Sequence, residues 1–561
     1  MDILGISYNY HDAAACLVQD GRALAAAEEE RFSRRKHDAE FPRHAIAYCL
    51  REAGLEAAAL DAIAFYEKPA RKLERVLQIG KQYAPSSNDN IVAQFSQVIN
   101  SGINVERKIR RELKFEGPIY FCEHHLAHAA SAFFVSPFEH AAILTVDGVG
   151  EWATCADFIG RGDSIEPQRE IHYPHSLGLL YSTITSYLGF QVNDDEYKVM
   201  GLASYGKARF RKEMEELVQI RADGSITLAL PYFAFMFNRQ KMYTEKLEEL
   251  LGPARFPKET ITDRHRDIAA SIQSVTEDIL AAMACSCRER TAQKNLCLAG
   301  GVAQNCVANS RILERSGFEH VFVQPAPGDS GAAMGAALWA SHQISRVPRR
   351  IGDHHTLLGP AFSEQEIAAS LDRVGMSYVR LNQEALCHRV ALLISKNFVI
   401  GWFQGRMEFG PRALGSRSIL ANPCAPDMKD ILNARVKFRE EFRPFAPAVT
   451  EEAAPAYFDL SGRSPFMLFT PRVRPERAGE IPSVTHVDGT ARVQTVSKVE
   501  HPLFHRLIES FAKISGTPVL INTSFNVRGE PIVCTPDDAI KCFSATDIDF
   551  LAIGPFLVTK A

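Results

Sequence analysis

The sequence predicts an α/β protein whose open sheets carry ligand-binding loops at their strand ends. Polar or glycine-rich turns follow apolar, strand-like runs four times, at YNYHD (8–12), DGVGEW (147–152), GGVAQN (300–305) and PGDSG (327–331). A strand–turn–strand–turn–strand unit also occurs twice, which indicates an internal duplication. Ligands of open α/β sheets bind beside loops of this kind. For any single turn, the alternative is an ordinary connection between a strand and a helix.

The two repeats begin near residues 2 and 141, and each opens with an apolar run that ends in a polar turn. Asp20-Gly21 is a hairpin signal inside the first repeat. A helix of small residues is expected after the turn near 329. Strands are expected at 2–7, 13–18, from 23 onward, 141–146, 153–160 and 296–299.

A stretch rich in Pro, Gly and charge, 344–362, predicts a domain boundary. Beyond it, Ser363 and Glu366 form a capping box, 517–522 reads as a buried strand, and Thr535-Pro536 begins a helix. We therefore expect two domains, at 1–350 and 351–561, the second also α/β.

Composition narrows the class of protein. The 561 residues are 46% hydrophobic and 23% charged, with a net charge of −4, which is not typical of a nucleic-acid binder. The twelve cysteines are scattered without a C-x-x-C pair, and neither a signal segment nor a run of about 18 apolar residues is found. We expect a cytoplasmic protein with no membrane span and no nucleic-acid partner.

Histidine and aspartate residues suggest a metal site. In the alanine-rich stretch CEHHLAHAASAFF, His124 and His128 lie four residues apart and share one face of the expected helix, whereas His125 points elsewhere. Asp147 and Asp329 follow strands in polar turns. Two imidazoles and two carboxylates suit iron, zinc or manganese. The alternative is a solvated histidine cluster with two turn-capping aspartates.

Cationic loops in the second domain suggest an anion site. Arg406, Arg412 and Arg417 lie in a glycine-rich stretch, and further polar and basic residues follow in three other loops. One guanidinium group can bind two oxygens of a phosphate or carboxylate at once. The alternative is that these arginines form surface salt bridges with nearby glutamates. The further residues are Lys437, Arg443, Arg492, Asn522, Ser524, Asn526 and Arg528.

Two other features suggest chemistry near the strand ends of the first domain. His11, in the first polar turn, has an ordinary pKa of roughly 6.5 and suits general-base work on a hydroxyl, although a turn histidine bonded to Asp12 is the alternative. Gly300 and Gly301 would allow a ligand close to the backbone, with Asn305 offering an amide. The segment is neither a P-loop nor a dinucleotide fingerprint.

Taken together, the motifs resemble the O-carbamoyltransferases of nodulation-factor and antibiotic tailoring. The residues that carry the resemblance span the chain in one order: GISYNYHDAAACLV, EEERFSRRKHD, EHHLAH, TVDGVGEW, KVMGLASYG, LAGGVAQN, GDSGAAMGAA, GPRALGSRSIL, FRPFAP and NTSFNVRGEP. The resemblance implies a duplicated actin-like ATPase (ribonuclease H-like) domain similar to that of tRNA threonylcarbamoyl transferases, followed by a YrdC-like α/β domain.

The resemblance also implies roles for residues. The metal ligands would be His124, His128, Asp147 and Asp329, with Fe(II) the expected ion, and His11 would be catalytic. Gly300, Gly301 and Asn305 would hold an adenylate, with Lys36 and Lys198 as further contacts. Carbamoyl phosphate and ATP would bind at Arg412, Lys437, Arg443, Arg492 and Ser524, in the loops that also carry Asn522, Asn526 and Arg528.

The expected reaction begins with the second domain making carbamoyl-adenylate from carbamoyl phosphate and ATP. The first domain then transfers the carbamoyl group to a hydroxyl of a small-molecule natural product of secondary metabolism. Alternative functions are a tRNA-modifying enzyme of the threonylcarbamoyl kind, a non-catalytic nucleotide-binding protein and a sugar kinase, because a shared fold does not fix the activity. The acceptor and the oligomeric state are left open, with a homodimer among the assemblies considered.

Overall fold

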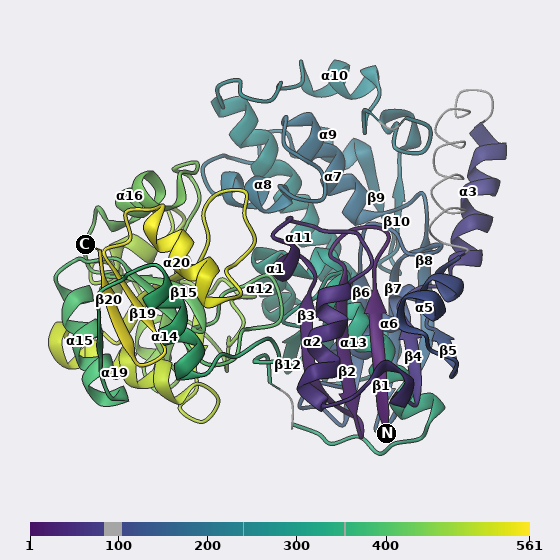
Figure 1. Ribbon diagram of the computed structural model, residues 1–561. Helices are drawn as coiled ribbons and strands as arrows, with labels where there is room; N and C mark the ends of the chain where they lie inside the picture. The colour runs from purple at the N-terminus through teal and green to yellow at the C-terminus, as the bar shows by residue number, and fades with distance from the viewer. Residues whose placement is uncertain (84–103, 239, 353–354, 561) are drawn as a thin grey trace. The chain divides into compact units, whose positions relative to one another are not determined.

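The computed structural model describes residues 1–83, 104–238, 240–352 and 355–560. It divides into two compact units (Figure 1). The first comprises Met1–Glu29 and His37–His354, and the second comprises Glu30–Lys36 and His355–Ala561. The second unit therefore includes a short N-terminal segment that contains α1 (Glu30–Ser33).

Buried hydrogen bonds hold that N-terminal segment in the second unit. The Arg31 side chain is 4% exposed and donates to the Gly410 carbonyl over 2.8 Å. Arg34 donates to the carbonyls of Pro531 and Ile532, each over 2.7 Å. Cationic side chains thus satisfy backbone carbonyls that would otherwise be buried without donors.

The first unit contains two five-stranded sheets with the same topology. In each, three antiparallel strands are followed by two parallel strands, in the spatial orders β3-β2-β1-β4-β5 and β8-β7-β6-β11-β12. The repeated order confirms the predicted duplication and the α/β class. The strands are β1 (Asp2–Ser7), β2 (Ala14–Gln19), β3 (Arg22–Glu28), β4 (Ala62–Phe65), β5 (Ile119–Phe121), β6 (His140–Val146), β7 (Ala153–Arg161), β8 (Ser164–His172), β11 (Asn295–Ala299) and β12 (His320–Val323).

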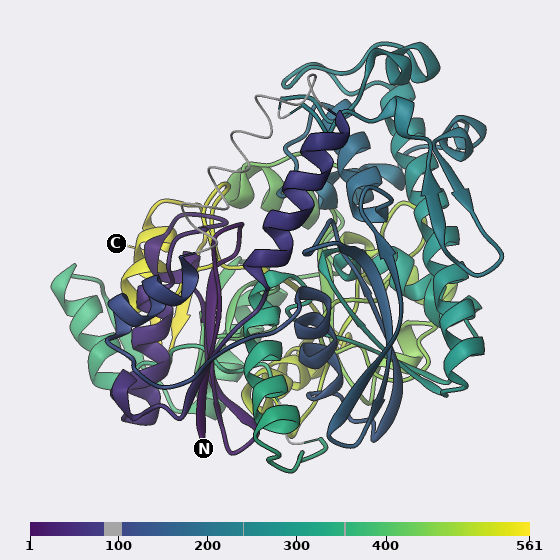
Figure 2. The same ribbon diagram turned by 90° about the vertical axis from the view of Figure 1, so that its right-hand side faces the viewer.

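Helices surround these sheets, and a two-stranded ribbon accompanies them (Figure 2). The ribbon consists of β9 (Val218–Ile220) and β10 (Ile226–Leu228). The helices are α2 (Arg43–Ala53), α3 (Pro69–Tyr83), α5 (Val105–Leu113), α6 (His124–Phe133), α7 (Leu177–Tyr187), α8 (Glu196–Ala203), α9 (Arg211–Leu217), α10 (Glu245–Leu251), α11 (Asp263–Thr291), α12 (Cys306–Arg315) and α13 (Asp329–Trp339).

One helix of this unit, α11, is long and apolar enough to cross a membrane by length and composition alone, judged over the described residues. However, 67% of its apolar window is buried inside the protein, as in the core helix of a globular domain. Glu277 and Asp278 also lie within it. These features fit a helix that packs against protein.

Helices α6 and α13 pack directly against each other. Helix α6 also covers β6 and β11, whereas α13 covers β1 and β2, so the pair lies between the two sheets. Gly335 of α13 faces the backbone of α6, and a Cβ there would lie far inside van der Waals contact with the Ala127 carbonyl. A glycine is therefore needed for this helix–helix approach.

The second unit is a mixed eight-stranded sheet in the order β13-β20-β19-β14-β15-β18-β16-β17, the second α/β domain expected from the sequence. Its strands are β13 (Tyr378–Arg380), β14 (Ile400–Phe403), β15 (Arg417–Ala421), β16 (Ala446–Thr450), β17 (Gln494–Val496), β18 (Val519–Ser524), β19 (Phe550–Ile553) and β20 (Phe556–Thr559). Its helices are α14 (Glu364–Arg373), α15 (Gln383–Ser395), α16 (Met428–Ile431), α17 (Ala454–Tyr457), α18 (Pro475–Ala478), α19 (Pro502–Ser515) and α20 (Pro536–Ser544).

Alternating side chains of this sheet fill two hydrophobic cores. On β14, Ile400 and Trp402 join the core beneath α15 and α19, while Phe403 joins the core beneath α14 and α20. Successive side chains of a strand point to opposite faces, so one apolar strand supplies both cores. The sheet is therefore covered by helices on both faces.

Substituting Gly335→Ala is expected to lower the free energy of unfolding by about 1–3 kcal/mol, because the new methyl overpacks the contact between α6 and α13. Thermal denaturation measures the effect. Gly479→Ala is the control, because a Cβ at Gly479 meets no atom within 4 Å. A Gly335→Ala protein as stable as the wild type would contradict the close contact.

Candidate functional site

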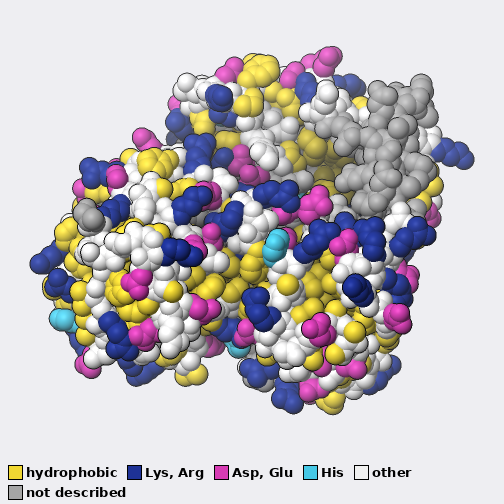
Figure 3. Space-filling model, in the orientation of Figure 1, with side chains coloured by type: hydrophobic (Ala, Val, Ile, Leu, Met, Phe, Trp, Pro, Cys, Tyr) yellow, Lys and Arg dark blue, Asp and Glu magenta, His cyan; other side chains and the backbone are white. Residues whose placement is uncertain are grey.

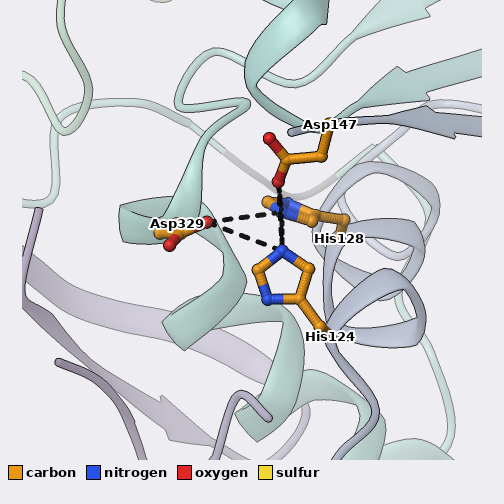
Figure 4. A group of neighbouring side chains, drawn as sticks. All are labelled: His124, His128, Asp147 and Asp329. Atoms are coloured by element: carbon orange, nitrogen blue, oxygen red, sulfur yellow. Dashed lines mark hydrogen bonds and ion pairs between the residues drawn. The ribbon is translucent and has the colours of Figure 1, made fainter. Parts of the chain in front are cut away.

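Four side chains converge in the first unit where α6, β6 and α13 meet (Figure 4). His124 and His128 project from one face of α6, as their spacing predicts. Asp147 directly follows β6, and Asp329 is the first residue of α13. The packing of α6 against α13 therefore brings ligands from two helices and one strand end to the same point.

The donor atoms of these four residues all lie within 4.8 Å of one another. The Nε2 atoms of His124 and His128 are 3.1 Å apart, and each lies 3.0 Å from Asp147 Oδ2. Asp329 Oδ1 lies 3.7 Å from His124 Nε2 and 3.6 Å from His128 Nε2. Three of the residues are buried, and the side chain of Asp147 is 17% exposed.

The electrostatics of this group fit a bound divalent cation. Burial opposes protonation of His128, but its hydrogen bonds to Asp147 and Asp329 outweigh burial and raise its pKa to about 9. The Nδ1 atoms of both histidines are buried without a hydrogen-bond partner among the described residues, so only the Nε2 side of each ring is engaged. Two nitrogen and two carboxylate donors facing one point form a set typical of transition-metal sites.

Glu151 holds the beginning of the ligand helix. Its carboxylate accepts hydrogen bonds from the backbone N–H of His124, at 3.1 and 3.2 Å, and from that of Lys68 at 2.7 Å. A carboxylate at a helix N-terminus satisfies free N–H groups and interacts favourably with the helix dipole. Glu151 was not predicted from the sequence, where the available signal was an acid in the DGVGEW turn.

His125 has a structural role. Its Nδ1 lies 2.7 Å from Thr145 Oγ1 and its Nε2 lies 3.0 Å from the Ala153 carbonyl. Burial lowers its pKa to about 3, so the ring is neutral. As expected from the helical spacing, His125 points away from the ligand group.

His11 ends a chain of hydrogen-bonded side chains in the turn after β1. Its Nδ1 lies 2.9 Å from Asp12 Oδ2, while Asp12 Oδ1 lies 2.7 Å from His37 Nδ1. His37 Nε2 lies 3.1 Å from Asp194 Oδ1. Of these contacts, only the one with Asp12 was expected from the sequence. Burial favours neutral His11, but the charge of Asp329 and the hydrogen bond to Asp12 prevail and raise its pKa to about 9.

One of the predicted adenylate residues, Gly301, lies beside the carboxylate of Asp147. Gly300 has a φ of +89°, and a Cβ there would collide with the Val146 carbonyl. Gly301 N–H lies 3.3 Å from Asp147 Oδ1. Asn305 caps α12 through Ala308 N–H at 3.0 Å and exchanges hydrogen bonds with Gln273. Its side chain thus shapes the loop.

The two predicted lysine contacts lie in different units. Lys198 of α8 forms an ion pair with Asp195 at 2.6 Å and lies over the ring of Phe190. Lys36 is exposed and belongs to the N-terminal segment of the second unit. Lys198 therefore belongs to the same unit as the predicted adenylate residues, and Lys36 belongs to the other.

In the second unit, Lys437 lies in a cradle of oxygens from β18 and the loop after it. Its Nζ donates to Ser524 Oγ at 3.1 Å and to Asn526 Oδ1 at 2.7 Å, and also to the carbonyls of both residues. Burial holds the pKa of Lys437 well below its usual value. The described contacts of Nζ are with neutral oxygens, so a bound anion would favour the charged form that burial disfavours.

Buried polar groups shape the loop that carries Arg412. The carboxylate of Glu408 accepts the backbone N–H groups of Leu414, Ser416 and Arg417 at 2.7–3.1 Å. Asn522 donates to the Ala413 carbonyl at 3.2 Å and to Gln494 Oε1 at 2.7 Å. Gln494 lies two residues after Arg492, so Asn522 links the loops that carry Arg412 and Arg492.

The remaining arginines divide into two groups. Arg443 and Arg528 both pair with Glu440, at 3.6 and 3.4 Å. Arg406 and the fully buried Arg417, which the sequence placed in the same anion set, instead donate to backbone carbonyls, including those of Gly359 and Pro360. These two guanidinium groups stabilise the fold because loops of this shape leave carbonyls without backbone partners.

Comparisons with known proteins identify the family to which the chain is similar. The family model described as carbamoyltransferase N-terminus matches residues 2–338, and that described as carbamoyltransferase C-terminus matches residues 391–560. Nodulation protein NolNO of Sinorhizobium fredii is 39% identical over 98% of this chain and 79% of its own length. Nodulation protein U of Rhizobium tropici is 30% identical over 97% and 93%.

Other similar proteins include the Synechocystis protein sll1178, 44% identical over 100% of this chain and 96% of its own length. Among solved structures, HypF of T. kodakarensis matches 61% of this chain and 48% of its own, with 17% identity and a TM-score of 0.32. The two family models together cover most of the chain and confirm the resemblance seen in its motifs. The chain belongs to the carbamoyltransferase family and is an enzyme of that class.

Proposed function

We propose that this enzyme uses ATP and carbamoyl phosphate to carbamoylate a hydroxyl of a small-molecule natural product. The observation that supports this most directly is that the first unit of this carbamoyltransferase contains both a cluster of four potential metal ligands and the hydrogen-bonded pair of His11 and Asp12. The mixture of acidic and basic side chains on the face shown in Figure 3, with a net charge of −4, favours a small acceptor over RNA.

The first stage is assigned to the second unit. Water cleaves carbamoyl phosphate to carbamate and phosphate, and a carbamate oxygen attacks the α-phosphorus of ATP, which releases pyrophosphate and leaves carbamoyl-adenylate. The phosphoryl oxygens gain charge during this displacement, and prearranged cations stabilise that charge. Lys437 is the central cation because its neutral cradle leaves its charge uncompensated.

The second stage is assigned to the first unit. Asp12 engages Nδ1 of His11, so Nε2 is the ring nitrogen left to take the proton of the acceptor hydroxyl. The hydroxyl oxygen forms a bond with the carbamoyl carbon, and AMP leaves. His124, His128, Asp147 and Asp329 would hold a divalent cation, with Fe(II) expected and Zn²⁺ or Mn²⁺ as alternatives, which supplies Lewis acidity when bound.

Incubation with ATP, isotope-labelled carbamoyl phosphate and a panel of hydroxylated metabolites tests the proposal. We expect pyrophosphate release that depends on carbamoyl phosphate, and one labelled carbamoyl group on an acceptor, detected by mass spectrometry. Transfer that proceeds equally well without ATP would contradict the adenylate route.

Substituting His11→Ala is expected to lower the rate of carbamoyl transfer by ~10²–10⁴, because the acceptor hydroxyl loses its general base. Pyrophosphate release should continue, since it is assigned to the second unit. The control is His172→Ala, whose ring is 53% exposed and pairs with Glu170. Wild-type transfer by the His11→Ala enzyme would eliminate the proposed role.

Substituting Lys437→Met is expected to reduce carbamoyl-phosphate-dependent pyrophosphate release by ~10²-fold or more, because a side chain of similar length replaces the charge that stabilises the phosphoryl group. Lys513→Met, at an exposed position of α19, is the matched control in the same unit. Circular dichroism verifies folding. Unchanged pyrophosphate release from a folded Lys437→Met enzyme would exclude the assigned role.

The pH behaviour of His11 offers an independent readout. In the metal-free protein its pKa of about 9 keeps the ring protonated at neutral pH, so the free base forms only above about pH 9. Substituting Asp12→Asn removes an anionic partner of the protonated ring and should lower that pKa, as measured by NMR titration of labelled histidines. Addition of Zn²⁺ should also lower it, by offsetting the charge of Asp329. An unshifted pKa in both experiments would contradict this assignment.

A further inference from the structure

Arg75 is a buried cation on the inner face of α3 that the reaction described above does not use. Arg75 is 8% exposed, whereas the side chain of Arg71 on the same helix is 47% exposed. Among the described residues of α3, the buried positions are Pro69, Arg75, Val76 and Gly80, so Arg75 is the charged member of that set.

The carboxylates that act electrostatically on Arg75 are those of Glu67 and Glu151, and these, like the carboxylate of Glu123 beside Arg71, are engaged with other groups. Glu67 forms an ion pair with Lys72 at 2.9 Å, and Glu123 pairs with Arg71 at 2.6 Å. Glu151 accepts the backbone N–H groups at the beginning of α6. Within the described part of the chain, Arg75 makes no ion pair, and its enclosed Nε has no hydrogen-bond partner.

The contact that Arg75 does make is with an aromatic ring, that of Tyr173, whose centroid lies 5.0 Å from the guanidinium carbon. A cation–π contact stabilises a buried cation by less free energy than the burial of its uncompensated charge destabilises the protein. Burial accordingly lowers the pKa of Arg75 from its ordinary value. A guanidinium in these surroundings can bind an anionic group of a ligand.

Aromatic rings connect this region to the proposed transfer chemistry. The ring of Tyr10 lies 4.5 Å from that of His11, and Lys72 Nζ lies 5.5 Å from the Tyr10 ring. The ring of Tyr66, at the end of β4, lies 5.5 Å from that of His124. An acceptor with its hydroxyl at His11 would thus have aromatic faces close by, and Tyr10 also interacts electrostatically with Arg75.

We propose that Arg75 binds an anionic group of the acceptor, so that the preferred substrate is a hydroxylated small molecule carrying a carboxylate, phosphate or sulfate. This inference rests on the carbamoyl transfer proposed above. The guanidinium fork would bind two oxygens of the anion, which suits carboxylate and phosphate geometry, while the tyrosine rings pack against the body of the acceptor.

Related acceptors with and without an anionic group test the inference. The probes are methyl β-D-glucuronide and glucose 6-phosphate, compared with methyl β-D-glucoside, and shikimate compared with its methyl ester. Each transfer rate is divided by the pyrophosphate release of the same preparation. The wild type should favour a charged member by at least about tenfold in kcat/KM, Arg75→Gln should remove that preference, and Arg75→Lys should retain part of it.

Arg71→Gln is the matched control, because it removes a 47%-exposed guanidinium from the same helix and should keep the preference. Equal transfer to charged and neutral members by the wild type, or an unchanged preference in Arg75→Gln, overturns the inference while the proposed function stands. If no probe is carbamoylated, thermal denaturation decides. Charged probes should raise the Tm of the wild type and not that of Arg75→Gln, and equal shifts in both overturn the inference. Absence of pyrophosphate release counts separately, against the proposed function.

Discussion

The contact between α6 and α13 is the constraint on which the candidate site depends. His124 and His128 belong to α6 and Asp329 begins α13, so the separation of the two helices sets the separation of the ligands. The absence of a Cβ at Gly335 allows their backbones to approach closely. Close packing transmits small displacements because protein interiors have few voids to absorb them. The geometry of the ligand cluster is therefore a consequence of helix packing in the core of the first unit.

Three elements of the candidate sites are held by carboxylates that accept hydrogen bonds. Glu151 fixes the beginning of α6, Asp12 orients His11, and Glu408 gathers three N–H groups of the loop that carries Arg412. These supporting groups are themselves enclosed or part-buried, where an unpaired charge is costly. The supporting residues thus have two linked functions, since the same bonds that satisfy them also position the reactive side chains.

Much of this arrangement was predictable from local sequence, and the rest was not. The strand–turn repeats predicted the duplicated sheets, and the four-residue spacing of His124 and His128 predicted their shared face. The contact of His37 with Asp194 spans 157 residues, and no local period encodes such a pairing. For Arg417 the local sequence was misleading, because its glycine-rich surroundings suggested that it binds an anion. In the structure its guanidinium donates to backbone carbonyls that come together only when the loops fold.

The ligand cluster and His11 also behave as one electrostatic unit. The carboxylates of Asp329 and Asp147 raise the pKa of both His128 and His11, so the charge at the cluster contributes to the protonation of His11. Without a cation, that charge keeps His11 protonated and unable to accept a proton at neutral pH. Neutralisation of the carboxylates would release the imidazole to act as a base. In the proposed mechanism, occupation of the cluster and protonation of His11 would therefore be coupled through Asp329 and Asp147.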